Sequence, residues 1–528
     1  MFDITISGGI IVDGTGQPGY RADLGITGEV IKVIGNLAYA EAKRVVDATG
    51  YIVAPGFIDT HTHSDGVLLS DPQHANSLRQ GVTTEILGQD GLSYAPLSPN
   101  NYRIFSRYLG GLLGNVTDDL DMSSVTAFKS HYHRKVSINT AYCVPHGAIR
   151  LNTVGFRDVQ LTGDSLAKAK QAIINGIEEG AVGFSTGLSY FPNSWSDTDE
   201  LVELCKATHD VGGVYVTHLR DVNTDRAFSN GGVPEALEIG RRSGVKVHFS
   251  HYLTRPSYAG TVKKQMELID EAKAEGVDCS LELYPYPTGS TFPIVFLPSY
   301  AHEDGPDGLI KRLRDPVERR KFINLLNDND DMPRDLDGAV FTYLSKNKHF
   351  EGMSFEDVCK QLDMTVGEAL CDILLEEDLQ VGFRGAPPHS VAIWNQISRD
   401  CMEFLSRPDY MVGSDSIPIG SLLHPRAFGT FPRFLGRLRR KFDMISLEQM
   451  IQRMTENPAR RFGVKKRGVV KSGYYADIVI FDAEHINDNA TYDDTRQFPT
   501  GVPFVLVNGQ LAVDHERCTG VFAGQAVP

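Results

Sequence analysis

The feature that most constrains the fold of this 528-residue chain is a series of short apolar runs separated by helix-length intervals. Each run ends in polar residues, and four successive ends, at Ser185, His218, His251 and Tyr284, are each 33 residues apart. Parallel strands in one sheet need a crossover of about a dozen residues or more between them, usually a helix. The spacing therefore predicts repeated βαβ units.

Eight such runs lie between about residues 55 and 463. They end at or near His61-Thr62-His63, Gln89-Asp90, Pro145-His146, Ser185-Thr186, Thr217-His218, Ser250-His251, Leu283-Tyr284 and Ser414-Asp415. Segments of suitable length and pattern for crossover helices lie at 165–179, 197–211, 234–243 and 262–275. Eight alternating units are typical of a (β/α)8 barrel.

Two departures from a simple barrel are visible. The step from Tyr284 to Asp415 is 131 residues, so we expect an insertion after strand seven, at about 286–350, partly covering the barrel mouth. The first fifty-odd residues alternate apolar and polar between Gly-rich turns, and a similar texture returns in 476–481 and 505–510, which favours short antiparallel strands. We therefore predict a small β-sandwich domain built from both termini (1–54 and 465–528) around a barrel at 55–464.

Composition excludes several function classes. A formal net charge of −15, without a basic run that contains interleaved aromatics, opposes nucleic-acid binding. No segment approaches the apolar length of a membrane span, and the amino terminus lacks a signal-peptide pattern. Seven scattered cysteines without a CxxC pair predict neither a disulfide framework nor a thiolate zinc site. We expect a cytoplasmic protein and leave its oligomeric state open.

The residues at the run ends indicate a metal site. His61 and His63 are two apart on a predicted strand and point to the same side, so both imidazoles can reach one metal. His218, His251 and Asp415 end later strands, and the carboxyl ends of barrel strands face one cavity. His248, three residues before His251, points away from that cavity and is predicted to pack.

The motifs that carry these residues resemble the amidohydrolase superfamily, and within it the D-aminoacylase (N-acyl-D-amino-acid deacylase) branch. The matching stretches are Ala54-Pro55-Gly56-Phe57-Ile58-Asp59-Thr60-His61-Thr62-His63, Gly183-Phe184-Ser185-Thr186-Gly187-Leu188-Ser189-Tyr190, Thr217-His218-Leu219-Arg220-Asp221, Leu283-Tyr284-Pro285-Tyr286, Gly413-Ser414-Asp415 and His424-Pro425-Arg426-Ala427-Phe428-Gly429-Thr430-Phe431-Pro432. The resemblance extends over nearly the whole chain.

The resemblance implies a role for each residue at the predicted site. His61, His63, His218 and His251 would bind metal, most simply one or two zinc ions. Asp415 would be a ligand or neighbour that takes a proton from the metal-activated water and passes it to the leaving amine.

The chain departs from the branch at the end of strand two. Where the branch has Asn-Cys-Gly, this chain has Gln89-Asp90-Gly91. A carboxylate can replace a thiolate on zinc and can bridge two metals, so Asp90 is a predicted ligand. The alternatives are an Asp-Gly turn without metal contact, or Glu85 on the same strand as the ligand.

The resemblance also suggests how the substrate is held. Arg426 resembles the arginine that grips the substrate α-carboxylate in the branch, Tyr284 would assist it, and Tyr190 would polarise the scissile carbonyl. The branch often carries a lysine after the strand-six Ser-His that meets an acidic side chain. Here Ser250-His251 is followed by Tyr252-Leu253-Thr254-Arg255-Pro256, which favours a neutral or apolar substrate.

The sequence thus predicts a metal-dependent amidohydrolase that cleaves the amide of an N-acyl-D-amino acid to a carboxylate and a D-amino acid. Its expected partner is a small-molecule amide with a carboxylate, and neither nucleic acid nor membrane is expected. Two alternatives stay open: a cyclic amide, carbamate or urea hydrolase on the same scaffold, and a non-catalytic homologue.

Overall fold

The computed structural model describes residues 1–328, 336 and 338–528. At its centre is an eight-stranded parallel sheet in the order β18-β14-β13-β12-β11-β10-β9-β8. Its strands are β8 (Phe57–Asp59), β9 (Val82–Leu87), β10 (Asn139–Pro145), β11 (Gly183–Gly187), β12 (Val214–His218), β13 (Lys246–Phe249), β14 (Cys279–Leu283) and β18 (Tyr410–Val412). These strands follow the predicted order, and the predicted (β/α)8 barrel is confirmed.

Backbone hydrogen bonds close the barrel between β8 and β18. The Thr60 amide donates to the Val412 carbonyl (3.3 Å), and the Asp415 amide donates to the His61 carbonyl (2.8 Å). Beyond the strands, the His63 amide donates to the Ser416 carbonyl (2.8 Å). Closure therefore places the predicted ligands of strands one and eight side by side.

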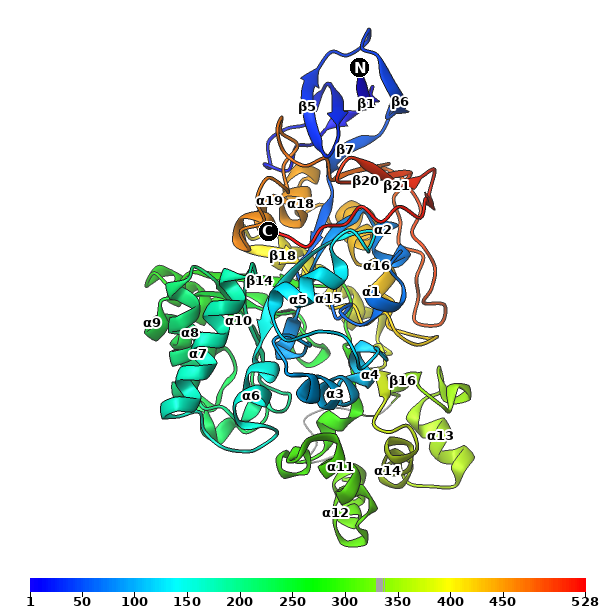
Figure 1. The fold of residues 1–528 in the computed structure, drawn as a ribbon. Helices are drawn as coiled ribbons and strands as arrows, with labels where there is room; N and C mark the ends of the chain where they lie inside the picture. The colour runs from blue at the N-terminus through cyan, green and yellow to red at the C-terminus, as the bar shows by residue number, and fades with distance from the viewer. Residues whose placement is uncertain (329–335, 337) are drawn as a thin grey trace.

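Helices surround the barrel (Figure 1). Those before β14 are α1 (Val67–Ser70), α2 (Ala75–Leu78), α3 (Pro99–Tyr108), α4 (Gly110–Leu113), α5 (Val125–Tyr132), α6 (His146–Val154), α7 (Gly163–Glu178), α8 (Thr198–Asp210), α9 (Gly232–Ser243) and α10 (Val262–Ala274). The predicted helices at 165–179, 197–211, 234–243 and 262–275 correspond to α7 to α10. Asp197 caps α8, because its carboxylate accepts the Glu200 amide (2.8 Å).

Additional elements lie between β14 and β18, as the insertion after strand seven requires. They are β15 (Ser290–Thr291), α11 (Gly305–Arg314), α12 (Pro316–Asn327), β16 (Val340–Leu344), α13 (Phe355–Leu362), α14 (Val366–Glu376), β17 (Val381–Arg384) and α15 (Val391–Ser406). Strands β15, β17 and β16 form a small antiparallel sheet. Within the predicted insertion, residues 329–335 and 337 lie outside the described residues.

After β18 the chain forms α16 (Arg426–Arg433), a π-helical turn (Phe434–Leu438), α17 (Arg439–Phe442), α18 (Leu447–Met454) and α19 (Glu456–Arg461). The two ends of the chain then meet in a seven-stranded sheet, β22-β21-β20-β19-β7-β2-β3. Its strands are β2 (Ile10–Ile11), β3 (Tyr20–Arg21), β7 (Ile52–Pro55), β19 (Ile478–Phe481), β20 (Phe504–Val507), β21 (Gln510–Asp514) and β22 (Arg517–Cys518).

A second terminal sheet is built from the amino-terminal segment alone. It has the order β5-β4-β1-β6, formed by β1 (Phe2–Ser7), β4 (Asp23–Thr27), β5 (Val30–Gly35) and β6 (Ala42–Asp47). Residues of both terminal sheets share one hydrophobic cluster, to which Ile6 and Leu24 contribute from one sheet and Val53 and Ile480 from the other. That these sheets form a separate sandwich domain stays a prediction, as do the domain limits.

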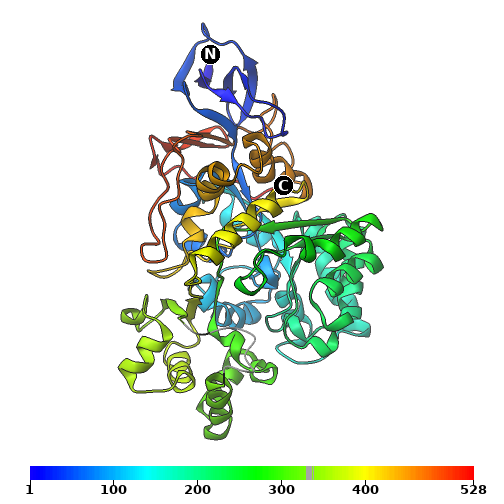
Figure 2. The same ribbon diagram turned by 180° about the vertical axis from the view of Figure 1, so that it is seen from behind.

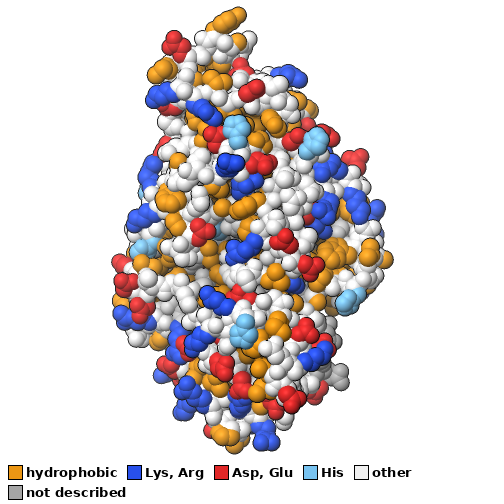
Figure 3. Space-filling model, turned by 90° about the vertical axis from the view of Figure 1, so that its right-hand side faces the viewer, with side chains coloured by type: hydrophobic (Ala, Val, Ile, Leu, Met, Phe, Trp, Pro, Cys, Tyr) orange, Lys and Arg blue, Asp and Glu red, His pale blue; other side chains and the backbone are white. Residues whose placement is uncertain are grey.

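The terminal sheets lie at one end of the molecule and α11 to α14 at the other, with the barrel between them (Figures 1 and 2). On the face drawn in Figure 3, lysine and arginine side chains are interspersed with acidic ones. None of the helices in the described residues is long and apolar enough to cross a membrane.

Candidate metal centre

The HxH pair of strand one projects into the barrel mouth directly after β8. His61 and His63 are buried, and their ring centroids are 5.2 Å apart. Both residues lie just beyond the end of β8 and not on the strand itself, yet their side chains reach the same cluster, as the i, i+2 spacing predicted. His61, His63 and Asp415 each offer a ligand atom within 4.8 Å of the others, and so do His61, Asp90 and His251.

The carboxylate of Asp90 lies among four imidazoles. Its Oδ1 is 3.6 Å from His61 Nε2, and its Oδ2 is 3.5 Å from His63 Nε2, 3.7 Å from His218 Nδ1 and 4.0 Å from His251 Nε2. Burial disfavours the charged carboxylate, but His61 and His63 outweigh burial and hold the pKa of Asp90 well below its usual range. The Asp90 side chain points into the centre of the cluster and not into solvent.

Asp90 reaches this position because its backbone is unusual. It lies in a 3-10 turn (Gln89–Gly91) after β9, with φ 55° and ψ 22°. From this left-handed position the carboxylate lies beside His61 and His63. Glu85, the alternative ligand from the sequence, lies elsewhere, since its carboxylate contacts His74 (2.9 Å) and Thr62 (3.2 Å).

His218 and His251, from β12 and the turn after β13, complete the cluster. Their ring nitrogens, His218 Nδ1 and His251 Nε2, are 2.9 Å apart. Burial and the neighbouring His218 lower the pKa of His251 to about 3, so its imidazole is neutral at neutral pH. A neutral imidazole is the form that binds a metal ion.

One carboxylate oxygen of Asp415 faces the histidine cluster, and the other forms an ion pair with an arginine. Its Oδ1 is 3.4 Å from His63 Nε2 and 3.7 Å from His61 Nε2, while its Oδ2 is 2.8 Å from Arg426 Nη1. Burial opposes ionisation, but Arg426 and His63 outweigh burial and hold the pKa of Asp415 well below its usual value. The carboxylate is therefore ionised at neutral pH.

Glu282 on β14 is a supporting residue that the sequence reasoning missed. This buried carboxylate lies 2.5 Å from His61 Nδ1 and 3.1 Å from His248 Nε2. Because Glu282 contacts Nδ1 of His61, the other ring nitrogen, Nε2, faces Asp90. Carboxylates commonly orient metal-binding histidines by such a contact to the nitrogen that does not bind the metal. His248, predicted to pack, therefore also supports this carboxylate.

The predicted substrate residues lie beside the cluster. The Tyr190 ring centroid is 5.1 Å from that of His218, and the Tyr190 hydroxyl is 3.3 Å from Thr291 Oγ1. The Arg426 guanidinium carbon lies 4.7 Å from the centre of the Tyr284 ring. Arg426 is fully buried and already paired with Asp415.

The buried polar atoms of the cluster fit a metal ion. Nε2 of His61 and Oδ1 of Asp90 are both buried and lack a hydrogen-bond partner in the described structure. Buried polar atoms normally have a partner, so these two atoms require one that the protein does not supply. Imidazole nitrogens and carboxylate oxygens are common ligands of zinc and related divalent metals.

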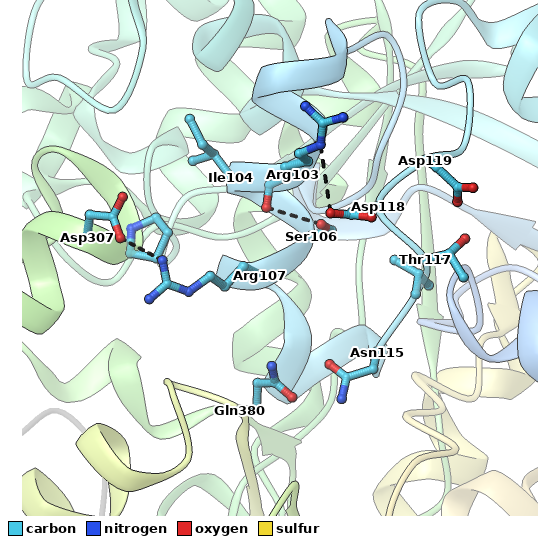
Figure 4. A pocket seen from close by; sticks show the side chains of 12 residues that line it. Arg103, Ile104, Ser106, Arg107, Asn115, Thr117, Asp118, Asp119, Asp307 and Gln380 are labelled. Carbon is cyan, nitrogen blue, oxygen red and sulfur yellow. Dashed lines mark hydrogen bonds and ion pairs between the residues drawn. The ribbon is translucent and has the colours of Figure 1, made fainter.

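A surface cleft away from the histidine cluster lacks these unpartnered metal-binding atoms. It lies between α3, the loop at 115–119 and α11, and its volume is about 760 Å³ (Figure 4). Its charged side chains pair with one another, as Arg107 with Asp307 (2.6 Å) and Arg103 with Asp118 (3.8 Å). No histidine of the cluster lines it.

The barrel, with histidines and carboxylates gathered at the carboxyl ends of its strands, has the architecture of metal-dependent hydrolases. The model of the amidohydrolase family matches residues 44–170 and 348–513, and the chain belongs to this family.

Individual relatives match over nearly the full length. The chain is 30% identical to a D-aminoacylase from Alcaligenes xylosoxydans xylosoxydans, covering 100% of this chain and 97% of the relative. It is 31% identical to an N-acyl-D-glutamate deacylase from the same organism, covering 96% and 93%. It also resembles the crystal structure of an N-acyl-D-glutamate deacylase from Bordetella bronchiseptica, complexed with zinc and a phosphonate mimic of the tetrahedral intermediate. That likeness has a TM-score of 0.82 and 30% identity, and covers 100% and 99%.

Proposed function

We propose that this protein hydrolyses the amide bond of an N-acyl-D-amino acid, releasing a carboxylate and a D-amino acid, with the help of bound metal. The observation that carries the proposal is the Asp90 carboxylate lying among His61, His63, His218 and His251. The full-length relatives named for deacylation of D-amino acids support the substrate class.

The residues that would hold metal are His61, His63, Asp90, His218, His251 and Asp415. Six ligands of this kind would be enough for one or two zinc ions, and Asp90 would contribute a carboxylate oxygen beside His61 and His251. Bound metal lowers the pKa of water towards neutrality and polarises the scissile carbonyl.

Asp415 is the proposed proton carrier. Its Oδ1 faces the histidines, so it lies on the side where water would attack, while Oδ2 is held by Arg426. In the proposed reaction, water oxygen bonds to the acyl carbon and a water proton passes to Asp415. When the C–N bond breaks, Asp415 returns that proton to the leaving amine nitrogen.

Tyr190 is proposed to orient the acyl carbonyl. The contact between its ring and His218 puts the phenol at the edge of the histidine cluster, where a substrate carbonyl would lie. Tyr284, which directly follows β14, and Arg426, the first residue of α16, would border the amino-acid part of the substrate.

The proposed function can be tested by removing and restoring the metal and by comparing substrates. Chelated protein should lose activity and regain it with zinc, and zinc-loaded protein should hydrolyse N-acetyl-D-amino acids in preference to their L-enantiomers. His218→Ala should lose bound metal, since no neighbour replaces a direct ligand. His485→Ala is the control, because this side chain is 82% exposed. Full activity of verified metal-free protein, or turnover of cyclic amides alone, would contradict the proposal.

A further inference from the structure

A second pocket lies between α15, the helical segment from α16 to α17 and the loop at 490–493. Its volume is about 480 Å³, which is within the range of about 300–1,000 Å³ that is typical of small-molecule sites. Among the described residues that line it are none of the six proposed metal ligands, and neither Tyr284 nor Arg426. The pocket is therefore separate from the metal centre and from the proposed substrate residues.

Three cationic side chains line one side of this pocket. Arg433 ends α16, Arg437 lies in the π-helical turn and Lys441 lies in α17. They follow one another at intervals of four residues, which places them along one face of the helical segment. Arg433 is buried, whereas the side chains of Arg437 and Lys441 are exposed. The two outer cations are therefore open to solvent.

The cations outnumber the carboxylates beside them. Buried Asp488 is shared by two arginines, since its Oδ2 is 2.9 Å from Arg433 Nη1 and its Oδ1 is 2.9 Å from Arg437 Nε. Lys441 contacts the side-chain oxygen of Asn395, and no carboxylate of the described residues lies within ion-pair distance of its ammonium group. Even with exposed Asp493 at the rim, three cations face two carboxylates. The pocket thus has an excess of positive charge.

The other walls of the pocket are mainly apolar and aromatic. The ring of Trp394, on α15, meets the Tyr492 ring edge-on, with 5.7 Å between their centroids. The Tyr286 ring lies 6.4 Å from that of Tyr492, and Leu438 and Ala490 also line the pocket. An apolar cavity with cations along one side is suited to a molecule that has an apolar body and one anionic group.

We propose that this pocket binds a small organic carboxylate with an aromatic or aliphatic body. Arg437 and Lys441 would contact the carboxylate, because Arg433 is buried in its pair with Asp488. Trp394 would contact the apolar body. The inference goes beyond the proposed function and does not depend on it, since no residue of the metal centre takes part.

Phenylacetate and its uncharged analogue phenylacetamide test this inference on the zinc-loaded, full-length protein. The chain has two tryptophans, of which Trp195 is fully buried and Trp394 lines the pocket, so tryptophan emission reports binding there. Phenylacetate should change the emission saturably, with a Kd on the order of 1 mM for a molecule of this size. Phenylacetamide should bind about tenfold more weakly, because it lacks the charge. Trp394→Phe should remove the signal.

Charge variants identify the side chains that hold the carboxylate. Arg437→Gln and Lys441→Gln should each raise the Kd for phenylacetate about three- to tenfold, and the double variant should bind acid and amide equally. Arg440→Gln is the matched control, because Arg440 precedes Lys441 but donates to the Ile486 carbonyl (3.0 Å) and does not line the pocket. Both replaced side chains are exposed, so folding should be retained, and circular dichroism checks it.

The outcomes that would overturn the inference are specific. They are no saturable change of emission with phenylacetate, equal affinity of the wild type for acid and amide, a signal that persists in Trp394→Phe, and wild-type affinity in the double charge variant. The comparison of acid with amide uses only the wild type, and therefore decides the question even if a variant folds poorly.

Discussion

Three side chains of the proposed metal centre project from residues with a left-handed backbone. Asp90, His251 and Asp415 have φ values of 55°, 34° and 52°. Non-glycine residues adopt this region at an energetic cost, and they do so mainly where the surrounding structure fixes them. Here barrel closure fixes Asp415, whose amide donates to the His61 carbonyl. The fold therefore fixes the backbone conformation from which these side chains project.

Replacing Asp90 tests whether its carboxylate is a ligand. Asp90→Ala should reduce bound metal and activity, whereas Asp90→Cys should retain both, because a thiolate also binds zinc. Metal content by atomic absorption is the measurement. Asp443→Ala is a matched control, since Asp443 has the same left-handed backbone (φ 49°) on an exposed helix end. Wild-type metal content in Asp90→Ala would mean that Gln89–Gly91 is only a turn.

Replacing Asp415 separates proton transfer from metal binding. Asp415→Asn should keep most of its metal but lose about 10²- to 10⁴-fold in kcat, because the amide cannot accept a proton at neutral pH. The paired measurements are metal content and kcat of the same sample. An unchanged kcat in fully loaded protein would place the proton carrier elsewhere.

At the scale of elements, a buried ion pair joins two helices behind the site. Arg150 on α6 donates to Glu200 on α8 (2.6 Å), and both side chains are buried. Burial raises the pKa of Glu200, but His146 and Arg150 outweigh it and lower that pKa to about 2. The pair thereby fixes α6, which begins at the end of β10, against α8.

Glu200→Gln should destabilise the protein by about 3–5 kcal/mol at neutral pH, because it leaves Arg150 as an unpaired buried charge. Glu203→Gln on the exposed side of α8 should cost less than about 1 kcal/mol. Urea unfolding of both variants gives the comparison.

The same pair has a defined pH dependence. Because the folded-state pKa of Glu200 lies below its unfolded value of about 4.3, its contribution is complete above pH ~4.3 and disappears as the pH falls to about 2. The difference between wild type and Glu200→Gln should therefore shrink across that window. A difference independent of pH would show that lost packing, and not lost charge, explains the destabilisation.

Elements are also the scale at which sequence reasoning was most successful. The polar ends of the apolar runs identified all eight barrel strands. The period of a βα unit can be read from the sequence alone, and so can the positions of HxH, His218, His251 and Asp415 at the ends of the runs. Glu282 was not identified. Glu282 reads as an ordinary polar position in β14, and its role depends on the register that puts it beside His61.

At the scale of the whole molecule, one buried asparagine connects the barrel to the carboxyl-terminal segment. Asn139 begins β10, and its Oδ1 accepts hydrogen bonds from the Asn508 side chain (2.8 Å) and the Gln525 amide (2.9 Å). Its Nδ2 donates to Asp477 (3.1 Å). The carboxyl-terminal segment is thus attached to the barrel through Asn139.

Asn139→Ala should leave at least two buried donors without an acceptor and destabilise the protein by about 2–5 kcal/mol. Limited proteolysis should then release the carboxyl-terminal segment before the barrel is cut. Asn489→Ala serves as a control, since its side chain makes an exposed contact with Phe498. A variant with wild-type unfolding and proteolysis would show that the segment is held by its apolar contacts alone.

The composition of the metal centre has a consequence for chemical durability. All seven cysteines are free, and none belongs to either group of potential metal ligands found in the described residues. Thiolates are oxidised stepwise by peroxides, whereas carboxylates are inert to them. With Asp90 among the histidines, the proposed metal centre contains no sulfur ligand among the described residues, so oxidation of a thiol would not remove any of the atoms proposed to hold the metal.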